Sequence, residues 1–357
     1  MPSHDVIIVG AAPAGSLAAL VLARAGHRVA LLDRAAFPRA KVCGNCINPA
    51  AWEIWHKLGL TESYSALPHQ ELAGFTIRSE GRLVFEQTFR PPHRGPRAIA
   101  RDVLDDWLRR EAQAAGAEFF PETTVTEINA PNGVVETTRG PFSGKLIFGA
   151  DGRNSIVARQ SGLMPPPRRC HRVAWQASLP APPGLDDHVH MHLFEEGYFG
   201  VSRYNSTEAV ISMVLDSRRT QEPLPLARRY FPQLGEQSWL RMNPITRAPA
   251  GTGAGRVWLL GDAARVVEPF TGEGITFALS TGLLAAEAAV DGLAKNDPAS
   301  TLKTYARAHR QLYRRRAWVN TLARWTLVTP SRTVRLLRKV KPPASLVSFL
   351  SNRVHAT

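Results

Sequence analysis

The sequence contains few cysteines and lacks long uninterrupted apolar runs. Its 357 residues include only three cysteines, Cys43, Cys46 and Cys170, which are too few for a disulfide scaffold. No stretch reaches the roughly 18 to 20 consecutive apolar residues of a membrane-spanning helix. A signal peptide is not expected either, because an apolar strand, residues 6–9, starts almost at the first methionine. These absences predict a soluble, cytoplasmic protein.

Acidic residues are missing from the C-terminal segment. Residues 298–357 contain no Asp or Glu but thirteen of the 44 Lys and Arg residues, while the rest of the chain carries 31 basic and 30 acidic residues. Trp318, Leu322 and Trp325 lie among these charges, as in segments that dock on the anionic inner face of a membrane. A solvated basic helix is the plainer alternative. Nucleic-acid binding is not expected, because the motifs described next are typical of a different ligand.

The pattern of apolar residues predicts an α/β protein. Residues 6–9, 29–32 and 257–260 are short apolar runs next to Ala-rich helical stretches, as in parallel βα units. Residues 75–85 contain a hairpin signal around a Ser-Glu-Gly turn, and residues 172–215 alternate like antiparallel strands. Parallel units at both ends thus enclose an antiparallel middle. This order predicts a Rossmann-type domain with a sheet inserted into it.

The first glycine motif lies between a predicted strand and a predicted helix. It consists of Gly10, Ala11, Ala12, Pro13, Ala14 and Gly15. A pyrophosphate needs a close backbone and free N–H groups at a helix N-terminus, and such a turn offers both. Gly10 permits the tight turn and Gly15 permits close helix–strand packing, whereas the usual middle glycine is Ala12 here. Asp33, which ends the second strand, is placed to accept hydrogen bonds from a ribose, and we include the adjacent Arg34 in the predicted site.

Two further motifs follow apolar strands. The second contains Asp151 and Gly152. The third contains Gly261, Asp262 and Pro269, then Gly272, Glu273, Gly274 and Ile275. Asp262 can bind a polyol chain, and the helix that opens at Gly272 places its positive N-terminus where a reduced flavin carries negative charge. Any one motif could be an ordinary turn, but all three in this order predict a single dinucleotide cofactor, FAD.

Through these motifs the sequence resembles the flavoprotein superfamily of aromatic hydroxylases and geranylgeranyl reductases, over most of residues 4–295. The resemblance implies that the first motif holds the pyrophosphate, Asp33 the adenosine ribose and Asp262 the ribityl chain. It also implies that Arg101, which begins an Arg-x-x-Leu-Asp segment, contacts the cofactor. Asp151 would serve both FAD and a reduced nicotinamide, so NADH or NADPH is the expected reductant.

Two local features favour the geranylgeranyl reductase branch, and one opposes it. Residues 41–44, Lys-Val-Cys-Gly, are similar to the Lys-x-Cys-Gly segment of that branch, so Lys41 joins the predicted cofactor site. The Gly-Glu-Gly-Ile sequence stands where many hydroxylases end in Asn. Against this, residues 198–203 keep only the Tyr of the branch's Tyr-x-Trp-x-Phe-Pro strand. Because these aromatic residues are missing, we expect oxygenation rather than reduction of a double bond.

Candidate catalytic residues come from three places. Cys43 lies in a Cys-x-x-Cys sequence, for which neither a thioredoxin-like role nor a metal site is expected, and it could contact the substrate or move a proton. His188, His190 and His192 share one strand face; if that face covers the flavin, His190 is the candidate acid or base, and a solvated face is the alternative. Pro269 would lie beside the isoalloxazine ring.

We therefore expect an FAD-dependent monooxygenase that uses NAD(P)H and O2 on a hydrophobic, aromatic or polyketide-derived substrate. A reductase of isoprenoid or polyene double bonds and a flavin electron carrier to a quinone are the alternatives. The FAD-binding domain is expected to comprise residues 1–67, 99–164 and 251–297. The substrate domain is expected to comprise residues 68–98 and 165–250, with residues 298–357 as a basic helical segment.

Overall fold

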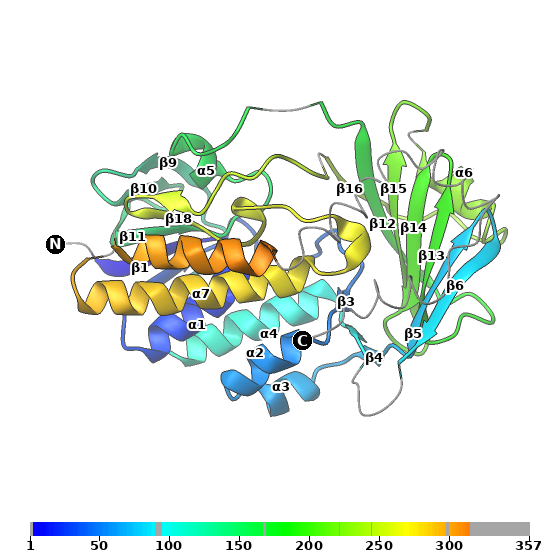
Figure 1. Cartoon of the computed structure of the whole chain (residues 1–357), viewed down its shortest axis with the longest axis horizontal. Helices are drawn as coiled ribbons and strands as arrows, with labels where there is room; N and C mark the ends of the chain where they lie inside the picture. Colours follow the sequence, from blue (N-terminus) through cyan, green and yellow to red (C-terminus); the bar gives the residue numbers. More distant parts are fainter. Residues whose placement is uncertain are drawn as a thin grey trace.

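The computed structural model describes residues 3–89, 95–166, 169–220, 222–243, 245–297 and 300–314. They form two lobes side by side, one layered from helices on a sheet and the other built mainly from a second sheet (Figure 1). The α/β class predicted from the sequence is confirmed. Of the basic C-terminal segment, residues 300–314 form a helix, and the residues expected to dock on a membrane lie outside the described part of the chain.

A mainly parallel sheet organises the first lobe. β1 (His4–Val9) pairs in parallel with β2 (Val29–Leu32) on one side and with β11 (Phe142–Gly149) on the other. β8 (Glu118–Phe120) extends the sheet beyond β2, and β18 (Val257–Leu259) extends it beyond β11. Antiparallel pairing adds β9 (Val125–Asn129), β10 (Val134–Thr137) and β17 (Gly253–Ala254). Because β1, β11 and β18 are parallel, the turns that follow them meet at one edge of the sheet.

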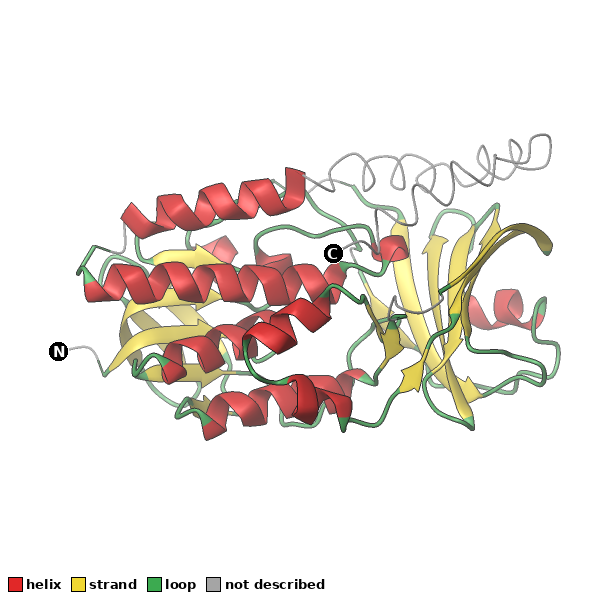
Figure 2. Ribbon diagram, turned by 60° about the horizontal axis from the view of Figure 1, so that its bottom comes forward, coloured by secondary structure: helices red, strands yellow, loops and turns green. Residues whose placement is uncertain are grey.

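Helices form a layer on one face of this sheet (Figure 2). The layer includes α1 (Pro13–Arg24), α4 (Arg101–Ala114) and α7 (Gly274–Ala294). α1 begins at Pro13, because the fixed φ of proline suits the first helical turn. α1 and α7 cross closely: a Cβ on Gly282 would lie 2.4 Å from the carbonyl oxygen of Ala14. Glycine at position 282 therefore lets the middle of α7 pass close to the first motif.

α7 has a composition that also suits a membrane span. Among the described residues it is the helix long and apolar enough to cross a bilayer, but 56% of its apolar window is buried inside the fold. The core of the lobe, with Leu279, Ala285 and Ala286 in contact with α1 and the sheet, accounts for that composition. The lobe also contains the shorter helices α2 (Ala51–Lys57), α3 (Thr61–Ser65) and α5 (Ile156–Gln160).

A seven-stranded sheet forms the second lobe. Its order is β16 (Leu240–Met242), β12 (Arg172–Pro180), β15 (Glu208–Asp216), β14 (Gly197–Arg203), β13 (His188–Phe194), β5 (Gly74–Ser79) and β6 (Arg82–Thr88). All neighbours are antiparallel except β13 and β5. The predicted hairpin is β5–β6, and the predicted antiparallel region is β12 to β15. A small sheet of β3 (Cys46–Ile47), β7 (Arg97–Ala98) and β4 (Gln70–Glu71) adjoins it.

The two faces of the seven-stranded sheet have different neighbours. On the outer face, Phe199 and Ile211 pack with Leu226 of α6 (Pro223–Arg228). On the inner face, Tyr198 and its neighbours turn towards the first lobe. Successive residues of a strand point to opposite faces. A shift of the strand pairing by one residue would therefore turn the other set of side chains towards the first lobe.

Candidate flavin site

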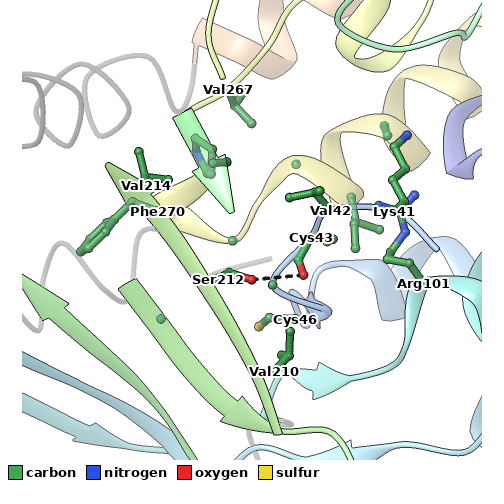
Figure 3. Close-up of a pocket in the computed structure, with 18 of the residues that line it drawn as sticks. Lys41, Val42, Cys43, Cys46, Arg101, Val210, Ser212, Val214, Val267 and Phe270 are labelled. Atoms are coloured by element: carbon green, nitrogen blue, oxygen red, sulfur yellow. Dashed lines mark hydrogen bonds between the residues drawn. The ribbon is translucent and has the colours of Figure 1, made fainter. Parts of the chain in front are cut away.

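A cavity of about 470 Å³ lies between the two lobes. All three glycine motifs contribute to one wall, through residues such as Ala12, Gly152 and Asp262. The inner face of the seven-stranded sheet contributes the opposite wall, through residues such as Val210 and Val214 (Figure 3). Motifs that are far apart in the sequence therefore meet at one site, because the strands that precede them, β1, β11 and β18, are parallel.

The first motif presents an uncapped helix N-terminus to the cavity. Ala12, Pro13 and Ala14 line it, and the N-cap of α1, Ala12, makes no side-chain hydrogen bond to the first turn. The glycines at the two ends are required by packing, because a Cβ on Gly15 would lie 1.9 Å from the carbonyl oxygen of Gly10, whose own φ is +105°. Free backbone N–H groups at such a terminus fit the pyrophosphate of FAD.

Asp33 is buried directly behind this turn. Its carboxylate accepts hydrogen bonds from the backbone N–H groups of Ala11, at 2.9 Å, and Ala35, at 3.0 Å. Asp33 is not among the residues that line the cavity, and Arg34 is exposed to solvent. The structure thus shows Asp33 fixing the glycine turn at the end of β2, while contact of Asp33 and Arg34 with adenosine stays a prediction.

A chain of buried charges runs from Asp33 to the cavity wall. Arg39 lies 3.4 Å from the carboxylates of both Asp33 and Asp105. Asp105 in turn accepts two hydrogen bonds from Arg101, at 2.9 and 2.8 Å, and Arg101 lines the cavity. Arg39 and Asp105 were not predicted as site residues, although Asp105 ends the Arg-x-x-Leu-Asp segment and Arg39 lies two residues before Lys41. The pairing holds the Arg101 guanidinium in one orientation beside the cofactor space.

In the second motif, Asp151 performs a local structural role. Its carboxylate accepts hydrogen bonds from the backbone N–H groups of Ile156, at 2.7 Å, and Val157, at 3.3 Å, which caps α5. Burial raises the pKa of Asp151. The next two residues, Gly152 and Arg153, line the cavity, whereas Asp151 does not. A direct contact of Asp151 with either nucleotide therefore stays a prediction.

The third motif borders the cavity along two short 3₁₀ helices, η1 (Gly261–Ala263) and η2 (Pro269–Thr271). Asp262 is partly exposed to the cavity, and Arg153 donates to its carboxylate at 3.3 Å. Pro269, Gly272, Gly274 and Ile275 also line the cavity, and a Cβ on Gly272 would meet open space. Glu273 is buried and precedes α7 without capping it. The N-terminus of α7 thus faces the cavity, as a flavin ring requires.

Lys41 and Cys43 enter the cavity from the loop before β3. Burial, followed by the nearby charge of Arg101, lowers the pKa of Lys41 to about 8. The backbone of Cys43 is bonded to the sheet at two points. Its N–H donates to Gln176 at 2.7 Å. Its carbonyl accepts from Ser212 at 3.3 Å (Figure 3). Burial, with a contribution from Cys43, raises the pKa of Cys46 to about 12, which opposes thiolate chemistry of the pair.

The three histidines of β13 point away from the cavity. Val189 and Met191 line it, so His190 and its two histidine neighbours lie on the outer face of the sheet. His190 lies within hydrogen-bond distance of Thr76, at 2.9 Å, and of Asp186, at 2.8 Å. The register of β13 places the odd-numbered residues inside, so the histidine face does not line the cavity, which favours the alternative of a strand face without a catalytic role for His190.

On the same face, His192 stacks on Phe199, with ring centroids 4.4 Å apart. Burial, followed by the charges of His190 and Arg78, lowers the pKa of His192 to about 4. It is therefore neutral near pH 7 and packs as part of the outer core.

The fold and the cavity together define an FAD-dependent oxidoreductase. Two uncapped helix N-termini, the tight turn at Gly10 and the carboxylate of Asp262 meet the needs of a pyrophosphate, a ribityl chain and a flavin ring. Comparison with known families agrees: the model of the FAD binding domain family matches residues 3–231. The chain belongs to this family, within the superfamily of geranylgeranyl reductases and aromatic hydroxylases.

Curated relatives extend over most of the chain. The menaquinone reductase of Mycobacterium tuberculosis (strain H37Rv) is 32% identical over 321 residues, covering 80% of this chain and 76% of the relative. The geranylgeranyl diphosphate reductase of Rhodobacter capsulatus is 30% identical over 320 residues, covering 83% of this chain and 77% of the relative.

Solved structures share the fold at lower identity. A geranylgeranyl bacteriochlorophyll reductase-like protein from Thermoplasma acidophilum aligns with a TM-score of 0.80 and 20% identity, covering 100% of this chain and 96% of the other. PqsL from Pseudomonas aeruginosa, solved with 2-aminobenzoylacetate, aligns with a TM-score of 0.78 and 19% identity, covering 94% of this chain and 100% of the other.

Proposed function

We propose that this protein is an FAD-dependent reductase that saturates a carbon–carbon double bond in a polyprenyl lipid. The observation that best supports the proposal is the sheet wall of the cavity. The described side chains of that wall are uncharged and mostly apolar, among them Phe75, Ile77, Val189, Met191 and Val210. Such a wall suits an extended hydrocarbon chain, whose burial contributes about 25 cal/mol per Å² of apolar surface.

The curated relatives support the same substrate class. They are named for menaquinone and for geranylgeranyl diphosphate, and both compounds carry polyprenyl chains. These relatives are more similar to this chain than the solved structures named above, whose identities of 19 and 20% support only the fold. This is why we favour reduction over the oxygenation that the shortened Tyr motif suggests.

Saturation of a double bond requires a hydride and a proton. Reduced FAD, when bound, supplies the hydride. Of the donors indicated by the sequence, the histidines face away, which leaves Cys43 at the cavity wall with its backbone fixed by Gln176 and Ser212. We propose that the Cys43 thiol donates its proton to the carbon that does not receive the hydride, and is protonated again from solvent. The product then gains two hydrogens.

An anaerobic turnover experiment tests the reaction. The chemically reduced protein is mixed with menaquinone that has an unsaturated side chain and, separately, with geranylgeranyl diphosphate. We expect a product two hydrogens heavier, with the absorption of the quinone ring unchanged, and slower formation of it by Cys43→Ala. A quinol spectrum without side-chain saturation would identify an electron carrier instead, and no product from either lipid would overturn the proposal.

Oxygenation is the second candidate, favoured by the open space at Gly272 and Gly274. A Cβ on Gly272 would meet nothing within 4 Å, and one on Gly274 would meet only Val267, at 3.9 Å. This space leaves room for a small reagent beside the ring. Turnover under labelled O2 separates the two reactions, because oxygenation places one labelled atom in the product and double-bond reduction places none.

We further propose NADH or NADPH as the reductant and an anionic membrane surface as a docking partner of the basic tail. Anaerobic bleaching of the flavin on addition of either nucleotide tests the first proposal, and absence of bleaching with both would point to a protein donor.

The docking proposal depends on the charge of the basic C-terminal segment, because each basic residue near an anionic surface contributes on the order of 1 kcal/mol. Removal of residues 330–357 should therefore weaken binding to anionic vesicles at low salt; unchanged binding would reject docking through the tail.

A further inference from the structure

A buried ion pair joins the segment before α7 to the substrate sheet. Arg172, the first residue of β12, donates to both carboxylate oxygens of Glu268, at 2.9 and 2.7 Å. The Glu268 side chain is 2% exposed and that of Arg172 is 11% exposed. A bidentate pair shielded from solvent is much stronger and more directional than a surface pair. The segment that carries Glu268 is thus anchored by the opposite lobe.

Tyr198 completes this cluster. Its hydroxyl donates to the Glu268 carboxylate at 3.0 Å, and its ring lines the cavity. Burial and the charge of Glu268 raise the pKa of Tyr198 well above its ordinary value, so the phenol stays neutral. One guanidinium, one carboxylate and one neutral phenol give the cluster no net charge. Removal of either charged partner would change the net charge of this buried cluster by one unit.

The cluster lies at the start of the segment that borders the flavin space. Pro269 and Phe270 follow Glu268 directly, and both line the cavity. Phe270 also packs edge-on against Tyr198, with ring centroids 5.3 Å apart. A net charge on Glu268 or Arg172 would therefore act across an apolar, poorly screening cavity wall rather than through bulk water.

We propose that Arg172, Glu268 and Tyr198 form a positioning unit that sets the reduction potential of bound FAD by neutralising the Glu268 carboxylate beside the cavity. Reduction adds negative charge to the flavin. An uncompensated carboxylate nearby disfavours that charge, whereas an uncompensated guanidinium favours it. The pair therefore holds the reduction potential at an intermediate value. Loss of Arg172 would lower the potential, and loss of the Glu268 charge would raise it. This inference depends on FAD binding and is independent of the reaction proposed above.

Paired substitutions test the sign of the effect. In Arg172→Met, the cluster loses the guanidinium that pairs with Glu268, and we expect the midpoint potential of bound FAD to become more negative. In Glu268→Gln, Arg172 is uncompensated, and we expect a shift to a more positive potential. In the double variant both charges are gone, so the potential should return close to that of the parent protein. Titration against reference dyes measures all three without any substrate.

The controls separate charge from folding. Arg218→Met breaks a similar bidentate pair with Asp216 on the surface, and neither residue lines the cavity, so it should leave the potential unchanged. Arg172→Lys retains the charge and provides a second test if the methionine variant does not fold. The proposal would be overturned if the potentials of the two single variants shifted in the same direction, or if neither shifted more than that of the Arg218 control. A pair that only holds the lobes together would not shift the potential in opposite directions when opposite charges are removed.

Discussion

The two walls of the cavity are built from different kinds of residue. The wall formed by the glycine motifs carries all four charged side chains that line the cavity in the described part of the chain, namely Lys41, Arg101, Arg153 and Asp262. The described residues of the sheet wall include no charged side chain. A cofactor with fixed charges needs fixed partners, whereas a hydrocarbon chain needs only shape and an absence of unpaired polar groups. Changes on the first wall should therefore affect FAD binding, and changes on the second should affect the substrate.

The largest effect is expected from Asp262→Ala on the motif wall. A hydrogen bond to a charged group contributes about 1.5–3 kcal/mol, which corresponds to a roughly ten- to hundredfold loss of FAD affinity. The ratio of flavin to protein absorbance in the purified variant measures this loss. Asp291→Ala, which changes an exposed aspartate of α7, is the matched control. Full FAD occupancy in the Asp262 variant would show that this carboxylate does not hold the ribityl chain.

Gly200→Trp makes the corresponding change on the sheet wall. A Cβ at this position would lie 2.9 Å from the sulfur of Met191, a flexible side chain that can move aside. The indole would then fill part of the cavity, and overfilling by about 1–3 kcal/mol corresponds to a roughly five- to hundredfold loss of turnover. FAD content should stay at the parent level, and Gly200→Ala should have little effect. Loss of flavin with unchanged turnover per bound FAD would contradict the division between the walls.

Lys41→Met tests the electrostatics of the motif wall through pH. Since the pKa of Lys41 is lowered to about 8, the side chain is charged below that pH and neutral above it. FAD is an anion, so its affinity should fall as pH rises through about 8, by at most about tenfold per pH unit for one proton. The methionine variant should lack this fall, while Lys57→Met, at an exposed position paired with Glu287, should retain it. An identical slope in both variants would assign the pH dependence to another group.

The sequence predicted the motif wall well, because its determinants are local. A strand, a glycine turn and a helix specify both the backbone of Gly10–Gly15 and the ligand that it can hold. The same holds for Asp262 and Gly272, which lie where the motif places them. Partners outside the motifs, such as Arg39 and Glu268, were missed. Their roles depend on contacts between segments far apart in the chain, and one sequence carries no signal of such pairing.

The sheet wall was predicted in type but not in orientation. Alternation over residues 172–215 indicated antiparallel strands, and the structure confirms them. Alternation cannot show which of two faces meets the other lobe, because that depends on how β13 pairs with β5 and β14. For this reason the sequence left open whether the histidine face covers the flavin or faces away from it. The alternate residues of the same strand, Val189 and Met191, are apolar, and they were the better indication of the face that lines the cavity.

The smallest effect is expected from the outer face of β13, and it provides the sharpest test of that register. His190 and Val189 are neighbours in the chain but point to opposite sides of the sheet. His190→Gln keeps a side chain that can hydrogen bond to Thr76 and Asp186, so turnover should stay within about twofold and its pH profile should not change, as for substitutions away from a site. Val189→Gln places an unpaired amide on the apolar wall and should lower turnover several-fold, because burial of an unpaired polar group costs about 1–3 kcal/mol. Steady-state turnover of both variants across pH 5 to 9 measures the contrast. If the His190 variant lost a limb of the pH profile while the Val189 variant behaved like the parent protein, the histidine face would be the catalytic one after all.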